Sequence, residues 1–259
     1  MRHAFESKRM SLTVLITGAS AGLGAAMARR FVADGHRVIA TARRADRLAA
    51  LHGELGAGLL PFALDVTDAA AVAALPGALP EAWRAVDVLI NNAGLALGLD
   101  PGHRADLADW DRMVAVNVTA LMHVTRALLP GMVERNRGHV INLSSTAAIY
   151  PYPGGHVYGA SKAFVTQFSL SLKADLIGTG VRVTDLEPGL VGGTEFSTVR
   201  FGDAARAAGV YAGTQPLTPE DIAEAAAWVV GLPAHVNVNR MELMPTCQAP
   251  AALAIKRST

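Results

Sequence analysis

A tyrosine and a lysine lie four residues apart in HVYGASKAF, as Tyr158 and Lys162. If this segment is helical, both side chains project from one face, one turn apart. A tyrosine has a pKa near 10, and lowering it by about 3 units corresponds to roughly 4 kcal/mol. A unit charge about 4 Å away supplies roughly that much at an effective dielectric constant near 20. Tyr158 is therefore a candidate acid/base with Lys162 as its electrostatic partner, although two ordinary helical side chains have the same spacing.

A glycine pattern provides the second chemical signal. In VLITGASAGLG, Gly18, Gly22 and Gly24 follow a short apolar run and precede an amphipathic segment. Glycines let a backbone approach a phosphate closely, and a helix N-terminus supplies free N–H groups and partial positive charge. The pattern predicts a dinucleotide site rather than glycines that merely allow tight packing. We expect its contacts to come from Gly18, Ser20, Ala21, Gly22, Leu23 and Gly24.

The end of the second strand candidate indicates which dinucleotide binds. An NAD site has a carboxylate about 20 residues after the glycines to hold the ribose hydroxyl. This chain has Ala42 there, followed by Arg43 and Arg44. Guanidinium groups suit the 2′-phosphate of NADP, which they can bind bidentately. The sequence predicts NADP as the cofactor, unless both arginines are ordinary solvated loop residues.

An α/β scaffold must position these residues. Strand candidates lie at residues 12–17, 37–41, 59–65, 86–91, 139–144, 181–186 and 241–244, and helix-length segments at 22–34, 109–135, 157–177 and 219–232. Apolar strands separated by helices indicate a parallel sheet buried on both faces. We expect a seven-stranded, doubly wound Rossmann-type sheet in one domain, residues 11–259. We also expect a flexible N-terminal extension, residues 1–10, and a substrate loop at about 189–218.

Composition narrows the class of protein. The 259 residues are 51% hydrophobic with a formal net charge of +1, so no basic field for nucleic acid is expected. Cys247 is the single cysteine, which fits a reducing cytoplasm. No apolar run approaches the roughly 18 residues of a spanning helix, so we expect no membrane association. The eight histidines have no ligand-like spacing, and we predict no metal site.

Further motifs resemble those of the short-chain dehydrogenase/reductase family. The chain contains TGASAGLG, NNAG after the fourth strand candidate, AVNVT, and INLSS followed by YGASK, in the family's order over nearly its whole length. Within the family, NNAGLALG, LLPGMVERN, VYGASKAFVTQFSL and VRVTDLEPGLVGGTEFS are similar to the NADP-dependent 3-hydroxy acid dehydrogenases. That branch acts on serine, L-allo-threonine and related short 3-hydroxy acids. It is also similar to malonic semialdehyde and sulfoacetaldehyde reductases.

The resemblance implies four catalytic residues: Asn117, Ser145, Tyr158 and Lys162. Ser145, thirteen residues before Tyr158, corresponds to the serine that hydrogen-bonds the reacting oxygen. Ser144 is its neighbour and rival, but strand alternation puts the two on opposite faces and the family spacing selects Ser145. Lys162 would also hold the nicotinamide ribose hydroxyls. Asn117 would interrupt a helix and hold a water molecule that conducts protons to Lys162. Without the other motifs, an exposed helical asparagine would be the preferred interpretation.

The same resemblance implies cofactor contacts at the carboxyl ends of later strands, where open α/β sheets bind ligands. They are Asp65 and Val66 at the adenine, Asn92 and Gly94 beside the adenosine ribose, and Pro188, Gly189, Val191 and Thr194 over the nicotinamide and pyrophosphate.

A short acid substrate needs a cation and donors near Tyr158. Arg200, in STVRF, is the candidate for binding the carboxylate, with a surface loop charge as the alternative. Gln248, in MPTCQ, is a candidate donor, and Ser145 and Tyr158 complete the expected substrate site. His156 is close to Tyr158 in sequence, but we expect an exposed turn histidine rather than a second base.

The expected function is reversible, NADP-dependent hydride transfer between short 3-hydroxy acids, such as serine, L-allo-threonine or 3-hydroxypropionate, and their 3-oxo acids. The same site would serve a malonic semialdehyde or sulfoacetaldehyde reductase. A protein of another class, which senses NADP without catalysis, usually lacks the Tyr or the Lys. The resemblance also implies a homotetramer that packs the helices after the fourth and fifth strands across its subunits, and we expect the protein in the cytoplasm.

Overall fold

The computed structural model describes residues 11–251, and the expected N-terminal extension, residues 1–10, lies outside the described residues. Within this range the chain forms a seven-stranded parallel sheet in the order β3-β2-β1-β4-β5-β6-β7. The strands are β1 (Thr13–Thr17), β2 (Arg37–Ala42), β3 (Leu59–Ala63), β4 (Val88–Asn91), β5 (Gly138–Leu143), β6 (Val181–Pro188) and β7 (Arg240–Leu243). The order reverses between β1 and β4, so the predicted doubly wound fold class is confirmed.

Helices connect these strands and cover both faces of the sheet. They are α1 (Gly22–Ala33), α2 (Ala45–Leu55), α3 (Ala69–Ala78), α4 (Leu107–Val114), α5 (Leu121–Glu134), α6 (His156–Asp175), α7 (Phe196–Phe201), α8 (Ala204–Gly209) and α9 (Pro219–Val230). The segment expected to be the substrate loop carries α7 and α8, which had no clear signal in the sequence. A π-helical turn, Ala115–Ala120, joins α4 to α5.

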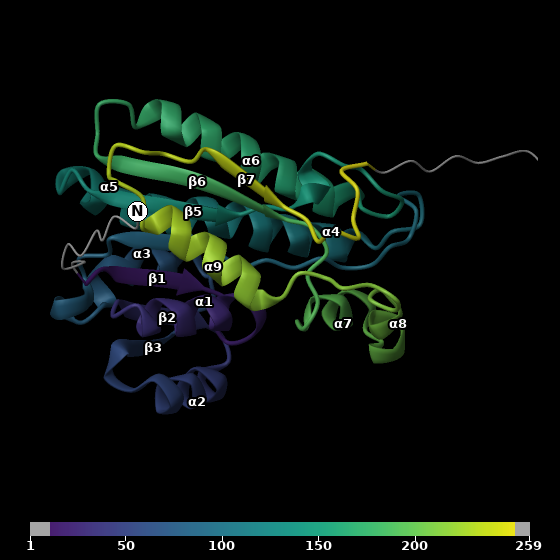
Figure 1. Ribbon diagram of the computed structural model, residues 1–259, viewed down its shortest axis with the longest axis horizontal. Coiled ribbons are helices and arrows are strands. Elements are labelled where there is room, and N and C mark those ends of the chain that lie inside the picture. The colour runs from purple at the N-terminus through teal and green to yellow at the C-terminus, as the bar shows by residue number, and fades with distance from the viewer. Residues whose placement is uncertain (1–10, 252–259) are drawn as a thin grey trace, which may run out of the picture.

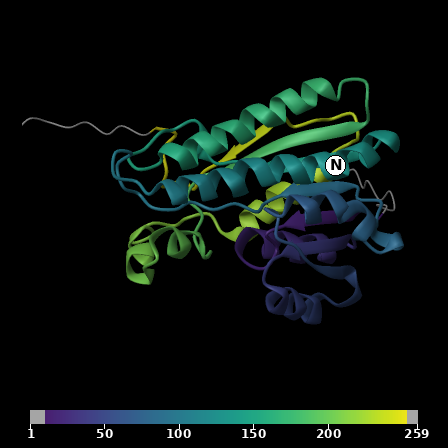
Figure 2. The ribbon, with the colours of Figure 1, turned by 180° about the vertical axis from the view of Figure 1, so that it is seen from behind.

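The core has two layers, one on each face of the sheet. Figure 1 shows α1 and α9 in front of the sheet, and Figure 2 shows the helix formed by α4 and α5 from behind. Ile16 of β1 packs in the layer with α1, α2 and α9, whereas its neighbour Leu15 packs in the layer with α3, α5 and α6. Both side chains are fully buried. Burial on both faces explains why the strands are continuously apolar in the sequence.

One helical stretch in residues 11–251, Leu107–Glu134, is long and apolar enough by length and composition to cross a membrane. From the sequence we expected no apolar run of that length. Asp109, Asp111 and Arg112 interrupt the apolar residues at the start of this stretch, so it is not a continuous apolar run in the sequence. Val124 and Met132 of the stretch are buried in the layer under the sheet. Core helices of soluble proteins pass the same test.

A row of buried polar side chains crosses the sheet on the side of α5 and α6. Asn91, Asn142 and Asp185 are register partners on β4, β5 and β6. Asn91 Nδ2 donates to Asn142 Oδ1 at 2.8 Å, and Asn142 Nδ2 donates to Ser169 Oγ on α6 at 2.8 Å. Both carboxyl oxygens of Asp185 are buried and accept no hydrogen bond, since the hydroxyl of Thr166 donates to Glu187 at 3.1 Å. The row therefore ends on a buried carboxyl group that the charge of Lys162 only partly stabilises.

Candidate active site

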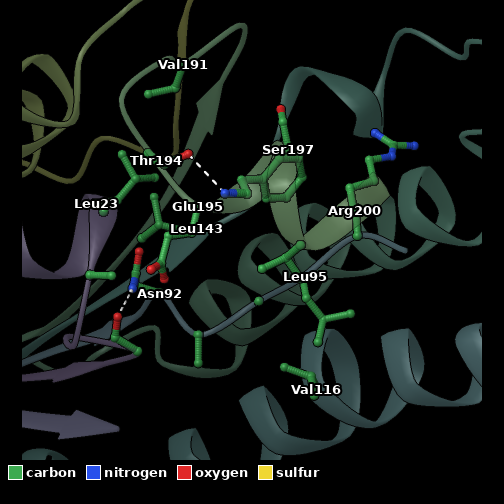
Figure 3. A pocket seen from close by; sticks show the side chains of 18 of the residues that line it. Leu23, Asn92, Leu95, Val116, Leu143, Val191, Thr194, Glu195, Ser197 and Arg200 are labelled. Carbon is green, nitrogen blue, oxygen red and sulfur yellow. Dashed lines mark hydrogen bonds between the residues drawn. The ribbon is translucent and has the colours of Figure 1, made fainter. Parts of the chain in front are cut away.

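A cavity of about 660 Å³ lies where the carboxyl ends of the strands meet the segment that carries α7 (Figure 3). Nearly all predicted cofactor residues line it, together with Ser145, Tyr158, Lys162 and Arg200. The predicted site residues that do not line it are Gly24, Asn117 and Gln248. The fold thus brings together residues that are up to about 180 positions apart in the chain.

The glycine loop follows β1 and leads directly into α1. Gly18 and Gly22 have φ values of 68° and 51°, a region that favours glycine. A Cβ on Gly24 would lie 2.5 Å from the Gly18 carbonyl oxygen, so Gly24 permits close packing inside the loop. Thr17 Oγ1 accepts from the backbone N–H groups of Asn92 and Ala93, 3.0 Å each. The loops after β1 and β4 are therefore held together beside the cavity.

The N-terminus of α1 is available to an anion. Its N-cap, Ala21, makes no side-chain capping bond, and no acidic residue lies in the first turn. The first N–H groups of such a helix lack intrahelical partners and carry partial positive charge. With the backbone of Gly22 lining the cavity, this end fits a pyrophosphate.

The next loop carries the arginines that the sequence assigned to a 2′-phosphate. Arg43 and Arg44 line the cavity, and Ala42, where an NAD site would have a carboxylate, is buried. Arg44 donates from Nε and Nη2 to Ser20 Oγ, at 3.2 and 3.0 Å. Asp65 also lines the cavity, and hydrogen bonds from Thr67, with smaller contributions from the charges of Arg43 and Arg112, lower its pKa. These residues fit NADP.

Ser145, Tyr158 and Lys162 meet on the floor of the cavity, and all three are buried. Ser145 Oγ donates to the Pro188 carbonyl at 3.3 Å, and this hydroxyl is close enough to Tyr158 to lower the pKa of the phenol. Lys162 Nζ donates to the Leu143 carbonyl at 2.7 Å and lies 5.9 Å from the centre of the Tyr158 ring.

Ser144 takes a different direction from its neighbour. Its hydroxyl donates to the Lys162 carbonyl at 2.8 Å and lies 3.0 Å from Thr166 Oγ1, both on α6. Ser145 is thus the serine that faces Tyr158, as strand alternation led us to expect.

Burial dominates the acid–base chemistry of the pair. It raises the pKa of Tyr158 to about 12, against lowering by the Ser145 hydrogen bond and by the charge of Arg200. Burial also lowers the pKa of Lys162 to about 8, against the charge of Asp185, which raises it. Burial therefore outweighs the nearby charges at Tyr158, and the expected lowering of its pKa by Lys162 stays a prediction.

Asn117 lies in the π-helical turn Ala115–Ala120 and is buried, so the alternative of an exposed helical Asn is wrong. Its Oδ1 accepts from Leu95 N and its Nδ2 donates to Leu95 O, both at 2.9 Å. A Cβ on Gly94 would lie 3.4 Å from Asn117 Oδ1 and 3.4 Å from Lys162 Nζ. Asn117 therefore fixes the loop beside Lys162, and its role in holding a water stays a prediction.

Arg200, on α7, reaches the cavity from the side opposite the sheet. Its Nε donates to the Gly98 carbonyl at 3.2 Å and its Nη1 donates to Tyr152 Oη at 2.9 Å. The guanidinium carbon lies 5.3 Å from the centre of the Tyr152 ring and 5.6 Å from that of Tyr158. Its Nη2 is buried without a hydrogen-bond partner. The alternative of a surface loop charge does not describe this environment.

Two other expected residues have structural contacts instead. Gln248 Oε1 accepts from Leu190 N at 2.7 Å, so the side chain holds the root of the loop after β6 rather than lining the cavity. His156 begins α6, where it is half-buried rather than exposed, and its Nε2 lies 3.0 Å from the Asp100 carbonyl. Among residues 11–251 no group of three or more His, Cys, Asp or Glu side chains could hold a metal ion.

Several residues at the site were missed by the sequence analysis. Tyr152 had no motif of its own, and Glu195, Arg47 and Arg112 looked like ordinary surface charges. Asp185 did carry a signal, because a carboxylate inside the apolar strand VRVTDLEP is unusual.

Comparisons with known proteins agree with this geometry. Residues 12–203 match the model of the short chain dehydrogenase family. The NADP-dependent 3-hydroxy acid dehydrogenase YdfG of Salmonella typhi is 59% identical over 248 residues, 95% of this chain and 100% of the relative. Serine 3-dehydrogenase of Rhizobium radiobacter is 50% identical over 251 residues, 96% and 100% of the two chains. The closed form of a serine dehydrogenase complexed with NADP+ superposes with a TM-score of 0.94 at 56% identity, covering 95% and 100%.

Asp185 gives a prediction for stability against pH. Burial, together with the Glu187 carboxylate, raises its pKa to about 7 from 3.8, while the charge of Lys162 lowers it. The folded state therefore binds this proton more tightly than the unfolded chain, and the resulting stability is lost as pH rises through about 7. Asp185→Asn, which cannot ionise, should raise Tm relative to wild type at pH 8, and this gain should shrink steadily towards pH 4.

Thermal unfolding between pH 4 and 8 measures this difference, with the exposed Asp111→Asn as a control that should show no such trend. A Tm difference for Asp185→Asn that does not change with pH would contradict the assignment.

Proposed function

The chain belongs to the short-chain dehydrogenase family, and from this premise we propose that it transfers a hydride between NADP and short 3-hydroxy acids, interconverting them with 3-oxo acids. It is an NADP-dependent oxidoreductase acting on CH–OH groups. What supports this function is that the glycine loop, the buried Tyr158 and Arg200 all line one cavity.

The observation that carries the choice of substrate is the Nη2 atom of Arg200. Nε donates to Gly98 and Nη1 donates to Tyr152, but Nη2 is buried and has no hydrogen-bond partner. A buried donor without a partner costs about 1–3 kcal/mol, more for a charged group. A carboxylate on the substrate would satisfy it and would neutralise the cation. An alcohol with a carboxylate close to its reacting carbon therefore fits the site.

Proton transfer falls to the residues on the cavity floor. When bound, NADP+ supplies the hydride acceptor. Ser145 would hold the substrate hydroxyl and Tyr158 would take its proton, since both side chains line the cavity and Ser145 is close enough to lower the pKa of the phenol. Lys162 lies one helical turn from Tyr158 with its Nζ 5.9 Å from the ring centre, and it also lines the cavity. In the reverse direction Tyr158 returns the proton to the carbonyl oxygen.

We also propose that the protein works as a cytoplasmic homotetramer. Large apolar side chains on α4, α5 and α6 are exposed and would suit helix packing across subunits: Leu107, Val114, Val133 and Phe164. Sedimentation that shows a monomer at working concentration would remove the tetramer. The cytoplasm is proposed as the compartment because the chain has a single cysteine, which fits a reducing environment.

The substrate class is tested by measuring NADP+ reduction with serine, L-allo-threonine, 3-hydroxypropionate, 3-hydroxyisobutyrate and isethionate, each repeated with NAD+. We expect turnover of 3-hydroxy acids, at least about tenfold better with NADP+ than with NAD+, because Arg43 and Arg44 favour the 2′-phosphate. Reaction of isethionate alone would favour a semialdehyde reductase with a sulfonate substrate. If all acids are inert while neutral alcohols react, the proposed acid specificity is wrong.

Arg200→Gln tests the acid site itself. Losing a charge-assisted, buried contact with the carboxylate should reduce kcat/KM for the 3-hydroxy acids by roughly 100-fold relative to its effect on a neutral secondary alcohol. Arg206→Gln is the matched control, because Arg206 lies on α8 over the Phe201 ring and does not line the cavity. Equal losses on acids and on neutral alcohols would mean that Arg200 does not bind the carboxylate.

A further inference from the structure

A carboxylate bridges the two sides of the cavity at its mouth. Glu195, the N-cap of α7, accepts from Arg44 Nη1 at 2.9 Å and from Arg47 Nη1 at 2.7 Å. Arg44 is the N-cap of α2, and Arg47 lies in the first turn of that helix. One side chain of the segment after β6 is thus tied to two arginines that lie about 150 residues earlier in the chain.

The bridge continues into the glycine loop. Arg44 uses Nη1 for Glu195, and its Nε and Nη2 both contact Ser20 Oγ. Thr194, next to Glu195, packs against Gly22, where a Cβ would meet the threonine side chain at 3.4 Å. The start of α7 therefore rests on the part of the protein expected to hold the cofactor phosphates (Figure 3).

The rest of α7 lies over Tyr158. Phe196, the first residue of the helix, packs against the Tyr158 ring with ring centres 5.7 Å apart, and Arg200, near its C-terminal end, lies over the same ring. Five residues of helix span only about 7.5 Å, so a shift at Glu195 moves Arg200 almost directly. A helix this short has little stability of its own, and its position depends on such tertiary contacts.

The charges favour a persistent bridge. Hydrogen bonds from Arg44 and Arg47 lower the pKa of Glu195, so its carboxylate is ionised at neutral pH. Because Arg47 shares the negative charge, Arg44 is not fully neutralised by Glu195. The edge of Arg44 that faces Ser20 stays directed into the phosphate end of the cavity.

We propose that Glu195 is a positioning residue that locks α7 onto α2 over the bound dinucleotide and so places Arg200 for the acid substrate. This inference rests on the proposed acid specificity. Glu195 acts through Arg200 and through the position of α7, and it touches neither the substrate nor the reacting atoms.

Glu195→Gln, Arg47→Gln and the double variant test the proposal, since Arg47 is outside the predicted cofactor set. The ion pairs are about half exposed, with side-chain exposures of 42–45%, which limits their energy. We therefore expect KM for a 3-hydroxy acid to rise about 3- to 10-fold in each single variant. The double variant should show no further rise over Glu195→Gln, because Arg47 acts on α7 only through Glu195.

Neutral alcohols and a remote ion pair provide the controls. KM for a neutral secondary alcohol should change less than about twofold in all three variants. Glu54→Gln removes another exposed pair, Arg29–Glu54, with exposures of 48% on both sides, and should leave every constant unchanged. Multiplicative effects in the double variant, or equal losses on acids and neutral alcohols, would overturn the proposal.

A second measurement separates this inference from the proposed function. If wild type turns over no 3-hydroxy acid, the acid specificity fails, but the bridge can still be tested in the NADP+ complex. Hydrogen exchange across residues 196–209 should be about 3- to 10-fold faster in Glu195→Gln and Arg47→Gln than in wild type and Glu54→Gln. Equal exchange in all four proteins would overturn the bridge itself.

Discussion

The buried phenol of Tyr158 is the constraint on which the rest of the site depends. Removing it from water raises its pKa to about 12, whereas a useful base must lose its proton near neutral pH. Positive charge must therefore gather around the ring. Arg200 lies 5.6 Å from the ring centre and Lys162 lies 5.9 Å away. The oxidised nicotinamide of bound NADP+ would add further positive charge.

The same burial affects the lysine, and the scaffold compensates for it. A buried Lys162 has a pKa lowered to about 8, close to the point where it would lose its charge. The charge of Asp185, on β6, raises the pKa of Lys162 and so opposes the effect of burial, although the carboxyl group of Asp185 is itself buried in the core. Helix α7 contributes as well, because its Arg200 is held near Tyr158 by Gly98 and Tyr152. Charged residues of two separate elements, α6 and α7, thus lie close to one tyrosine.

Much of the fold and the floor of the site could be predicted, because both have local signals. Apolar strands, glycines with positive φ, and the spacing from Ser145 to Lys162 depend on residues near each other in sequence. The contacts of Glu195 with Arg44 and of Tyr152 with Arg200 could not be predicted, because they form only when segments distant in the sequence pack together. The upward shift of the Tyr158 pKa could not be predicted either, because it is caused by burial, and burial is a property of the whole fold.

The central claim, that Tyr158 transfers the proton, is tested most directly with Tyr158→Phe. Single-turnover formation of NADPH from a saturating 3-hydroxy acid, together with the Kd for NADP+, separates chemistry from binding. The account predicts a rate about 10²- to 10⁴-fold below wild type, with the Kd for NADP+ changed by less than about threefold. Turnover at the wild-type rate would contradict it and assign the proton transfer to another group.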